Sequence, residues 1–211
     1  MLKPFNRRPD PGMPARLTAH RNDENRSYEE NHLEEWTARQ PASLFGSHDV
    51  MILGSQNYAH MPQKIDLLFV DRRRQLYVVE IKVEPVAKNG GVVPYTIYQV
   101  QMKTYVDFVK TCLQLEDLGH DYERFSKESY GQPLDLLEQY TKKFGTRLGP
   151  RGPLWSTICE IYVAPQFDEY ALRYIFVRSK ADARNARLIF YKFYPLFKYI
   201  EFWEHHEEPE V

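Results

Sequence analysis

Two acidic side chains and a lysine stand inside apolar stretches, where charged residues are rarely found. Asp66 lies in the segment KIDLLFV, and Glu80 and Lys82 lie in the segment QLYVVEIKV. Charged side chains are seldom fully buried unless they are paired or bind a metal. These three residues are therefore the first candidates for chemistry in this chain.

The spacing of the two segments predicts that the three side chains converge. Both segments have the composition of β-strands, and together they form a hairpin that turns at DRRRQ. If the turn is centred near Arg73, Asp66 and Glu80 stand opposite each other, with their Cβ atoms about 5 Å apart. Lys82 projects from the same face, because side chains alternate along a strand. A register shift of one residue would separate the two acids.

Two carboxylates this close together repel each other unless a cation lies between them or one of them carries a proton. Mg²⁺ prefers oxygen ligands and typically uses one or two carboxylates together with water and a substrate phosphate. A lysine beside a metal-bound water can orient the nucleophile or stabilise developing charge. The pattern therefore predicts metal-dependent hydrolysis of phosphodiester bonds. The alternative is a structural ion pair with Lys82, which would leave the second acid uncompensated.

The remaining segments predict an α/β domain that positions these residues. The expected helices are SYEENHLEEWTARQP, one long helix from Pro94 to Leu118, and FDEYALRYIFVRSKADA; the further expected strands are DVMILG, STICEIYVAP and RLIFYKFYP. A strand followed by a long helix and another strand implies a parallel crossover. The expected fold class is thus an α/β sandwich with a mixed central sheet.

The chain divides into three expected regions. Residues 1–26 are rich in Pro and Arg and are expected to form an extended N-terminal arm. Residues 27–200 form the domain, with an insertion at about 118–155 that carries a short helix capped by Gly145. Residues 201–211 form an acidic C-terminal tail.

The composition narrows the class of protein. The chain has 211 residues, of which 43% are hydrophobic and 27% charged, which is typical of a soluble globular protein. No apolar run approaches the roughly 20 residues of a membrane span, and no signal-peptide core is present, so a cytoplasmic protein is expected. Cys112 and Cys159 form no CxxC pair and are expected to be reduced core residues.

The net charge of −1 gives no overall basic excess. A surface that binds nucleic acid would therefore have to be a local patch, and the two candidates are Arg72 to Arg74 and Lys142 to Arg151. Solvated turns and loops are the alternative explanation for both segments.

The order Asp66, then Glu80-Ile81-Lys82 on the next strand, resembles the signature of the PD-(D/E)xK nuclease superfamily, with Ile65 in place of proline before the aspartate. Over residues Tyr28 to Phe167 the chain is similar to the NucS/RecB-type branch. The resemblance implies a restriction-endonuclease-like α/β/α sandwich and a DNA endonuclease that depends on Mg²⁺ or Mn²⁺. Many members of the superfamily act as dimers, so it also implies a homodimer.

The resemblance assigns roles to individual residues. Asp66, Glu80 and the backbone carbonyl of Ile81 would bind the metal, and Lys82 would be the catalytic lysine. Glu30 matches an acid on the first helix that supports the metal. The alternative for Glu30 is a capping box, in which its side chain bonds back to the backbone of Ser27.

Gln101 and Tyr105 match a Q-x-x-x-Y motif in which the glutamine helps to hold the site or the nucleic-acid strand. A helical face centred on Gln101 includes Ile97, Tyr105, Phe108 and Cys112, and it places Gln99 and Lys103 toward solvent. A core glutamine bonded to backbone is the alternative for Gln101. Contacts to nucleic acid are expected from Gln101, Tyr105, Arg72, Arg73 and Arg74.

A second hypothesis is a catalytically inactive module of the same fold that binds nucleic acid or assembles with a partner. The near-neutral net charge, the N-terminal arm and the insertion motivate it. A third is a homodimeric scaffold that binds no nucleic acid.

Overall fold

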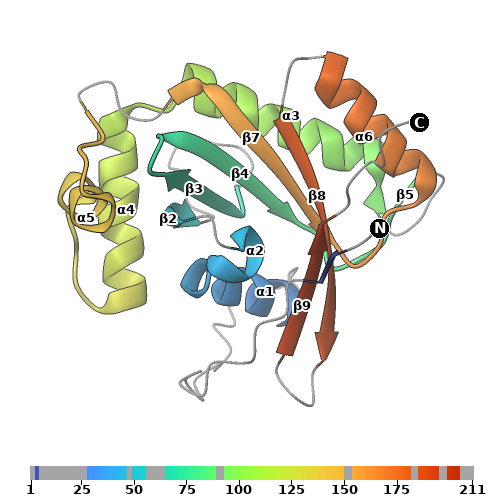
Figure 1. The fold of residues 1–211 in the computed structure, drawn as a ribbon, viewed down its shortest axis with the longest axis horizontal. Helices are drawn as coiled ribbons and strands as arrows, with labels where there is room; N and C mark the ends of the chain where they lie inside the picture. The colour runs from blue at the N-terminus through green and yellow to red at the C-terminus, as the bar shows by residue number, and fades with distance from the viewer. Residues whose placement is uncertain are drawn as a thin grey trace.

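A mixed β-sheet runs through the molecule and carries helices on both of its faces (Figure 1). The structure is a computed structural model. It describes residues 3–4, 28–46, 49–55, 65–88, 93–149, 154–181, 185–194 and 199–204.

The strands are β1 (Lys3–Pro4), β2 (Val50–Ser55), β3 (Leu67–Asp71), β4 (Gln75–Ile81), β5 (Val86–Ala87), β6 (Val93–Pro94), β7 (Leu154–Ala164), β8 (Asn185–Tyr194) and β9 (Tyr199–Glu204). The helices are α1 (Tyr28–Arg39), α2 (Ala42–Phe45), α3 (Tyr95–Thr111), α4 (Leu115–Tyr130), α5 (Leu136–Phe144) and α6 (Glu169–Ala181).

Within the described part of the chain, the main sheet has seven strands in the order β1-β9-β8-β7-β4-β3-β2, and β5 and β6 form a small second sheet. Strands β2, β3 and β4 are antiparallel, whereas β4, β7 and β8 are parallel to one another. Parallel neighbours need long crossover connections, and these contain α3, α4 and α5 in one case and α6 in the other. The predicted α/β sandwich with a mixed central sheet is confirmed.

The hairpin of β3 and β4 has the predicted register. Leu67 pairs with Val79 and Val70 pairs with Leu76. Continuing the same register by one residue beyond β3 brings Asp66 opposite Glu80.

The turn of this hairpin holds that register in place. Arg72, Arg73 and Arg74 form a three-residue loop, and Arg74 has the positive φ of 66° that the last residue of such a loop adopts. The carboxylate of Asp71 accepts hydrogen bonds from the backbone N–H groups of Arg73 and Gln75, both at 2.8 Å. These contacts fix where β3 ends and β4 begins.

The two faces of the main sheet are covered by different helices. Helices α1 and α2 lie on one side and α3 and α6 on the other (Figure 1). On the first side, the Phe45 ring of α2 lies 5.0 Å from Phe69. On the second side, the Tyr98 ring of α3 lies 5.0 Å from Tyr162, the ladder partner of Glu80. Ladder partners share a face, so Glu80 lies on the face that α3 covers.

The expected long helix is in fact two helices. Helix α3 ends at Thr111, and α4 begins at Leu115 with a capping box between Gln114 and Asp117. The apolar period continues through the break without Gly or Pro, and glutamine is an uncommon N-cap, so no stop signal marks the end of α3 in the sequence. The insertion thus contains α4 and α5 rather than one short helix. The predicted cap at Gly145 is confirmed, with φ 67°.

The boundary expected at residue 200 is wrong, because β9 continues to Glu204 and pairs with β8. Strand β1 pairs with β9, so at least Lys3 and Pro4 of the expected arm belong to the sheet. Cys159 is buried as predicted, but Cys112 is exposed and not a core residue. No helix in the described ranges has the length and apolar character needed to cross a membrane.

Helix α5 is attached to the hairpin turn by one side chain, and this gives a testable prediction. The buried hydroxyl of Tyr140 donates to the carbonyl oxygen of Asp71 at 2.9 Å and lies 3.2 Å from that of Arg72. Tyr140→Phe keeps the ring and removes the donor, so we expect the free energy of unfolding in urea to fall by about 1–2 kcal/mol. Tyr122→Phe is the control, because the buried Tyr122 makes no hydrogen bond through its hydroxyl to any described residue. An equal fall in the free energy of unfolding in both variants would contradict the prediction.

Candidate metal and catalytic site

Asp66, Glu80 and Lys82 come together at the end of the hairpin opposite its turn. Asp66 directly precedes β3 and is 2% exposed, and Glu80 on β4 is 1% exposed. Oδ2 of Asp66 accepts a hydrogen bond of 2.7 Å from the backbone N–H of Ile81. The ammonium group of Lys82 forms an ion pair with Oε1 of Glu80. Asp66 is thus bonded to the backbone of β4, and Glu80 is paired with the amine beside it.

The electrostatics of Glu80 differ from those of an ordinary surface acid. Burial raises the pKa of Glu80 well above its usual range, and the neighbouring charge of Asp66 raises it further, while Lys82 opposes both effects. The Lys82 side chain is 17% exposed, so this end of the site is open to solvent. A positive charge placed between the two acids would remove the cause of the repulsion.

The residues at this position fit a hard divalent cation. Oε2 of Glu80 is buried and has no hydrogen-bond partner among the described residues. The Ile81 carbonyl, which follows Glu80 directly in the chain, is the further oxygen ligand that the sequence analysis expects. No cluster of three or more His, Cys, Asp or Glu side chains suited to a metal occurs in the described part of the chain. Two carboxylates with water completing the shell is the ligand set that Mg²⁺ commonly uses.

Tyr98 is a residue of the site that the sequence analysis missed. Its fully buried hydroxyl donates to the carbonyl oxygen of Glu80 at 2.7 Å and accepts from the N–H of Val163 at 2.9 Å, so it joins β4 to β7 beneath α3. The Lys82 ammonium lies 5.6 Å from the centre of the Tyr98 ring. Burial, followed by the Glu80 charge, raises the pKa of Tyr98 well above its usual range, so the hydroxyl keeps its proton.

The face that α3 presents to the sheet differs from the predicted one. Its buried residues are Tyr98, Met102, Tyr105, Val106 and Val109. Gln99 and Gln101 flank this stripe, each about 80° from its centre at 100° per residue. Gln99 Nε2 and Gln101 Oε1 are both buried without a hydrogen-bond partner on any described residue.

The prediction that Gln101 alone is the inward amide is therefore wrong. Ile97 is 54% exposed and Cys112 is exposed, although both were assigned to the inward face. Because Ile97 and Cys112 are apolar, they were expected to face the sheet. The residues that pack on the sheet instead include Tyr98 and Tyr105. The spacing of Tyr98, Met102, Tyr105 and Val109 is that of a second candidate stripe, and periodicity alone does not rank it above the predicted one.

The other predicted residues do not all reach the site. Glu30 lies in α1, but its side chain is outside the described residues, and its support of a metal stays a prediction. Tyr105 is 2% exposed and packs in the core, so its predicted contact with nucleic acid is wrong. Arg72 and Arg73 are exposed and Arg74 is half-buried, but all three lie at the turn. Arg74 is six positions from Glu80 along β4, which is roughly 20 Å.

Two further buried acids were also missed. Glu34 of α1 is 5% exposed, and Glu160 of β7 is fully buried. Oε2 of Glu160 accepts a hydrogen bond of 2.8 Å from the hydroxyl of Tyr162. The ring of Tyr162 packs edge to face against the ring of Tyr98. Glu160 stands in the apolar segment ICEIYV, so the pattern that singled out Glu80 would have found it as well.

Comparisons with known proteins give one distant structural neighbour. No family model and no curated protein matches the chain. Among solved structures, the chain is similar to the crystal structure of a repair endonuclease from Pyrococcus abyssi, with 17% sequence identity and a TM-score of 0.39. The match covers 79% of this chain and 48% of that one, so the chain spans about half the length of that protein. A similarity of this size carries no functional argument, and the function has to be inferred from the site.

Proposed function

We propose that the protein is a divalent-metal-dependent DNA endonuclease that hydrolyses phosphodiester bonds. The observation that carries the proposal is the placement of two buried carboxylates, Asp66 and Glu80, on facing positions of the hairpin with the Lys82 ammonium beside them. A buried pair of like charges is costly, and in a structural role it would gain nothing over two apolar residues. A bound divalent cation would compensate both negative charges, so metal binding accounts for the placement of the two carboxylates.

In this proposal Asp66, Glu80 and the Ile81 carbonyl hold Mg²⁺ or Mn²⁺, which when bound would polarise the phosphate and lower the pKa of a water. Asp66 is oriented by the Ile81 N–H, and Glu80 is positioned by the bond from Tyr98 to its carbonyl. Lys82 is partly exposed, so its ammonium can contact the attacking oxygen or the charged phosphate.

Glu30 and Gln101 have supporting roles in the proposal. Glu30 would hold the metal directly or through water, and Gln101, with its buried amide oxygen, would bind a water or a substrate group near the site. A homodimer is the proposed assembly. The proposal does not depend on it, because both carboxylates come from one chain.

The experiment that tests the function is a cleavage panel. Purified protein is incubated with single-stranded, branched and duplex DNA and with RNA, in Mg²⁺, in Mn²⁺ or in excess chelator. We expect cleavage of at least one DNA form with metal, its loss with chelator, and its return when Mn²⁺ is added in excess. Cleavage that survives the chelator, or a complete lack of cleavage with either metal, would refute the proposal.

The second candidate function is a nucleic-acid-binding or assembly module without catalysis. The ion pair of Lys82 with Glu80 favours it, because the amine already compensates one of the two acids. This candidate predicts salt-sensitive affinity for DNA without any binding of divalent metal at Asp66 and Glu80. Calorimetric titration with metal and with DNA separates the two candidates.

A further inference from the structure

Basic residues from two distant parts of the sequence lie on the turn of the hairpin and on the helix and loop that dock against it. We call this surface the basic end, and it consists of Arg72, Arg73, Arg74, Lys142, Lys143 and Arg147. The bonds from Tyr140 to the backbone of the turn place α5 against it. The Arg74 guanidinium lies beside Gly149, 3.7 Å from the place where a Cβ would stand. The loop after α5 therefore borders the turn as well.

Most of the positive charge at the basic end is uncompensated. Arg72, Arg73, Lys142 and Arg147 are exposed, and none of the four forms an ion pair with a described residue. Lys143 pairs with Asp49 at 2.7 Å, but both side chains are exposed, so this pair is weak. Of the nearby acids, Asp71 is buried and accepts hydrogen bonds from the turn, and the exposed Glu138 of α5 forms no ion pair with Lys142.

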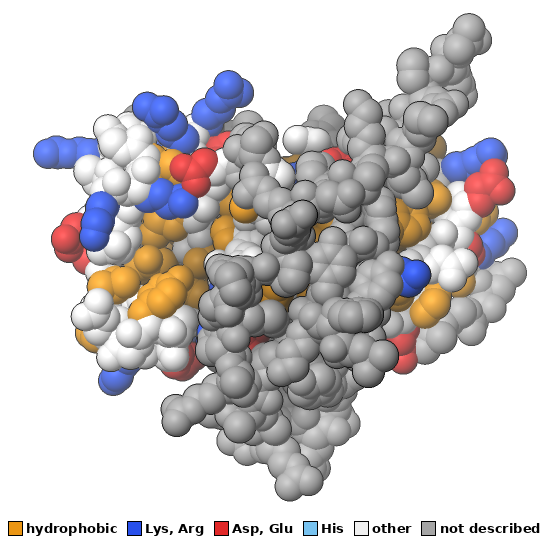
Figure 2. All heavy atoms as spheres, turned by 60° about the horizontal axis from the view of Figure 1, so that its bottom comes forward, with side chains coloured by type: hydrophobic (Ala, Val, Ile, Leu, Met, Phe, Trp, Pro, Cys, Tyr) orange, Lys and Arg blue, Asp and Glu red, His pale blue; other side chains and the backbone are white. Residues whose placement is uncertain are grey.

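This concentration of charge contrasts with the chain as a whole. The chain has 28 basic and 29 acidic residues, so a local excess of cations must be balanced by acids elsewhere. Several Lys and Arg side chains project from the end of the molecule that carries α5, with Asp and Glu side chains among them (Figure 2). A local positive field on a near-neutral protein attracts a polyanion to one place and orients it.

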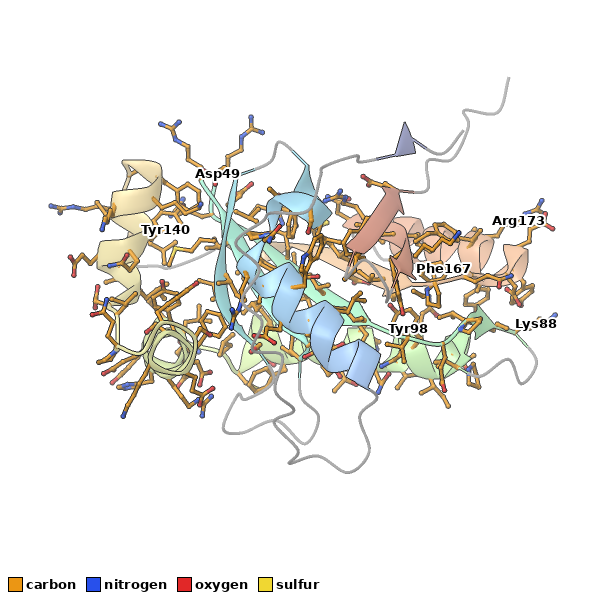
Figure 3. All side chains as sticks on the ribbon, turned by 90° about the horizontal axis from the view of Figure 1, so that it is seen from below. Asp49, Lys88, Tyr98, Tyr140, Phe167 and Arg173 are labelled. Atoms are coloured by element: carbon orange, nitrogen blue, oxygen red, sulfur yellow. The ribbon has the colours of Figure 1, made fainter. Side chains whose placement is uncertain are left out.

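The basic end is well separated from the acidic pair. Tyr140 and Asp49 lie toward one end of the molecule, whereas Tyr98, which bonds to Glu80, lies near its middle (Figure 3). The distance of roughly 20 Å along β4 corresponds to about six nucleotides, at 3.4 Å per nucleotide of one strand of a duplex.

We propose that the basic end binds the phosphate backbone of a polynucleotide. The contact lies about six nucleotides away from the phosphodiester bond that would be cleaved at Asp66 and Glu80. The binding rests on the charge of the surface alone, while the position of the cut rests on the function proposed above. Guanidinium and ammonium groups on an exposed turn and helix contact phosphates without reading bases, so the contact is independent of sequence.

The test compares two variants in chelator, in which the function proposed above predicts no cleavage. The first is Arg72→Ala/Arg73→Ala/Lys142→Ala/Arg147→Ala, and the matched control is Lys103→Ala/Lys110→Ala/Lys127→Ala/Arg173→Ala, which removes the same charge from α3, α4 and α6. Affinity for labelled single-stranded DNA, duplex DNA and RNA of about 20 nucleotides is measured by anisotropy at several salt concentrations.

We expect the first variant to bind at least about tenfold more weakly than wild type, with a salt slope on duplex DNA shallower by up to about 3.6, since each of four phosphate contacts contributes about 0.9. The control should stay within about twofold of wild type. The probe whose affinity falls most between wild type and the first variant identifies the form of polynucleotide that the basic end binds. Equal affinities and slopes for the two variants, with all folds intact by circular dichroism, would overturn the proposal.

The outcome is separable from that of the proposed function. If wild type cleaves DNA with metal and the first variant cleaves it with an unchanged KM, the nuclease stands and the basic end is not its binding surface. If the first variant loses affinity while no protein cleaves under any metal, the basic end binds polynucleotide and the nuclease proposal fails.

Discussion

Asp66→Asn is expected to lower the rate of metal-dependent DNA cleavage by at least a factor of about 10²–10³. Asparagine has nearly the same shape and keeps an oxygen that can accept from the Ile81 N–H, so the fold should be preserved. What it removes is the negative charge that would hold the cation. The measurement is the initial rate on the best substrate of the cleavage panel, at saturating Mn²⁺.

The control for this substitution is Asp107→Asn on α3. Asp107 is exposed, and it lies 3.9 Å from Lys103 in a pair that contributes little. Its rate should stay within about twofold of wild type. An Asp66→Asn protein that folds normally and cleaves at the wild-type rate would show that Asp66 does not take part in the reaction.

Glu80→Gln is expected to make the metal-free protein more stable at neutral and alkaline pH. The raised pKa of Glu80 means that the folded protein binds a proton more tightly than the unfolded chain does. In the window from the ordinary glutamate pKa of about 4.3 up to the raised folded pKa, stability therefore falls as pH rises, by up to about 1.4 kcal/mol per pH unit. Above that window the loss is complete. Glutamine cannot ionise, so the variant avoids it.

The free energy of unfolding in chelator, measured by urea at several pH values, checks this prediction. We expect Glu80→Gln to exceed wild type by at least about 1 kcal/mol above the window and to show a weaker pH dependence. Glu128→Gln, an exposed position on α4, serves as the control and should follow wild type. A Glu80→Gln protein that is less stable than wild type at high pH would mean that the ion pair with Lys82 is a net stabilising element.

The hairpin and its acids could be predicted from sequence because the relevant information is local. Alternating strand residues on either side of DRRRQ fix the register, and the register fixes which side chains face each other. Asp71 contributes as well, since its carboxylate binds the backbone of the turn. The order of helices and strands then determines that β4 and β7 are parallel.

The face of α3 could not be predicted in the same way. Periodicity identifies a helix but not which of two similar stripes packs on the sheet, and the chosen stripe included Ile97, which is exposed. Tyr98 is buried because its hydroxyl meets the backbones of β4 and β7. That contact depends on tertiary structure, and no spacing along the chain reports it.

The basic end shows the same limit at longer range. Arg72 to Arg74 and Lys142 to Arg151 were separate candidates in the sequence, each explicable as a solvated segment. The two segments come to the same end of the molecule because the Tyr140 hydroxyl bonds to the turn across 69 positions of sequence and Arg74 lies beside Gly149. These contacts depend on tertiary structure, so neither segment alone predicts that the two clusters lie at one end of the molecule.

Calorimetric titration of the metal-free protein with Mn²⁺ tests most directly whether Asp66 and Glu80 share a cation. We predict that wild type binds Mn²⁺ in a saturable manner, and that Asp66→Asn and Glu80→Gln each weaken this binding by at least about tenfold while Asp107→Asn does not. If wild type binds no divalent metal, or if the two site variants bind it as tightly as wild type does, the two carboxylates are not a metal site.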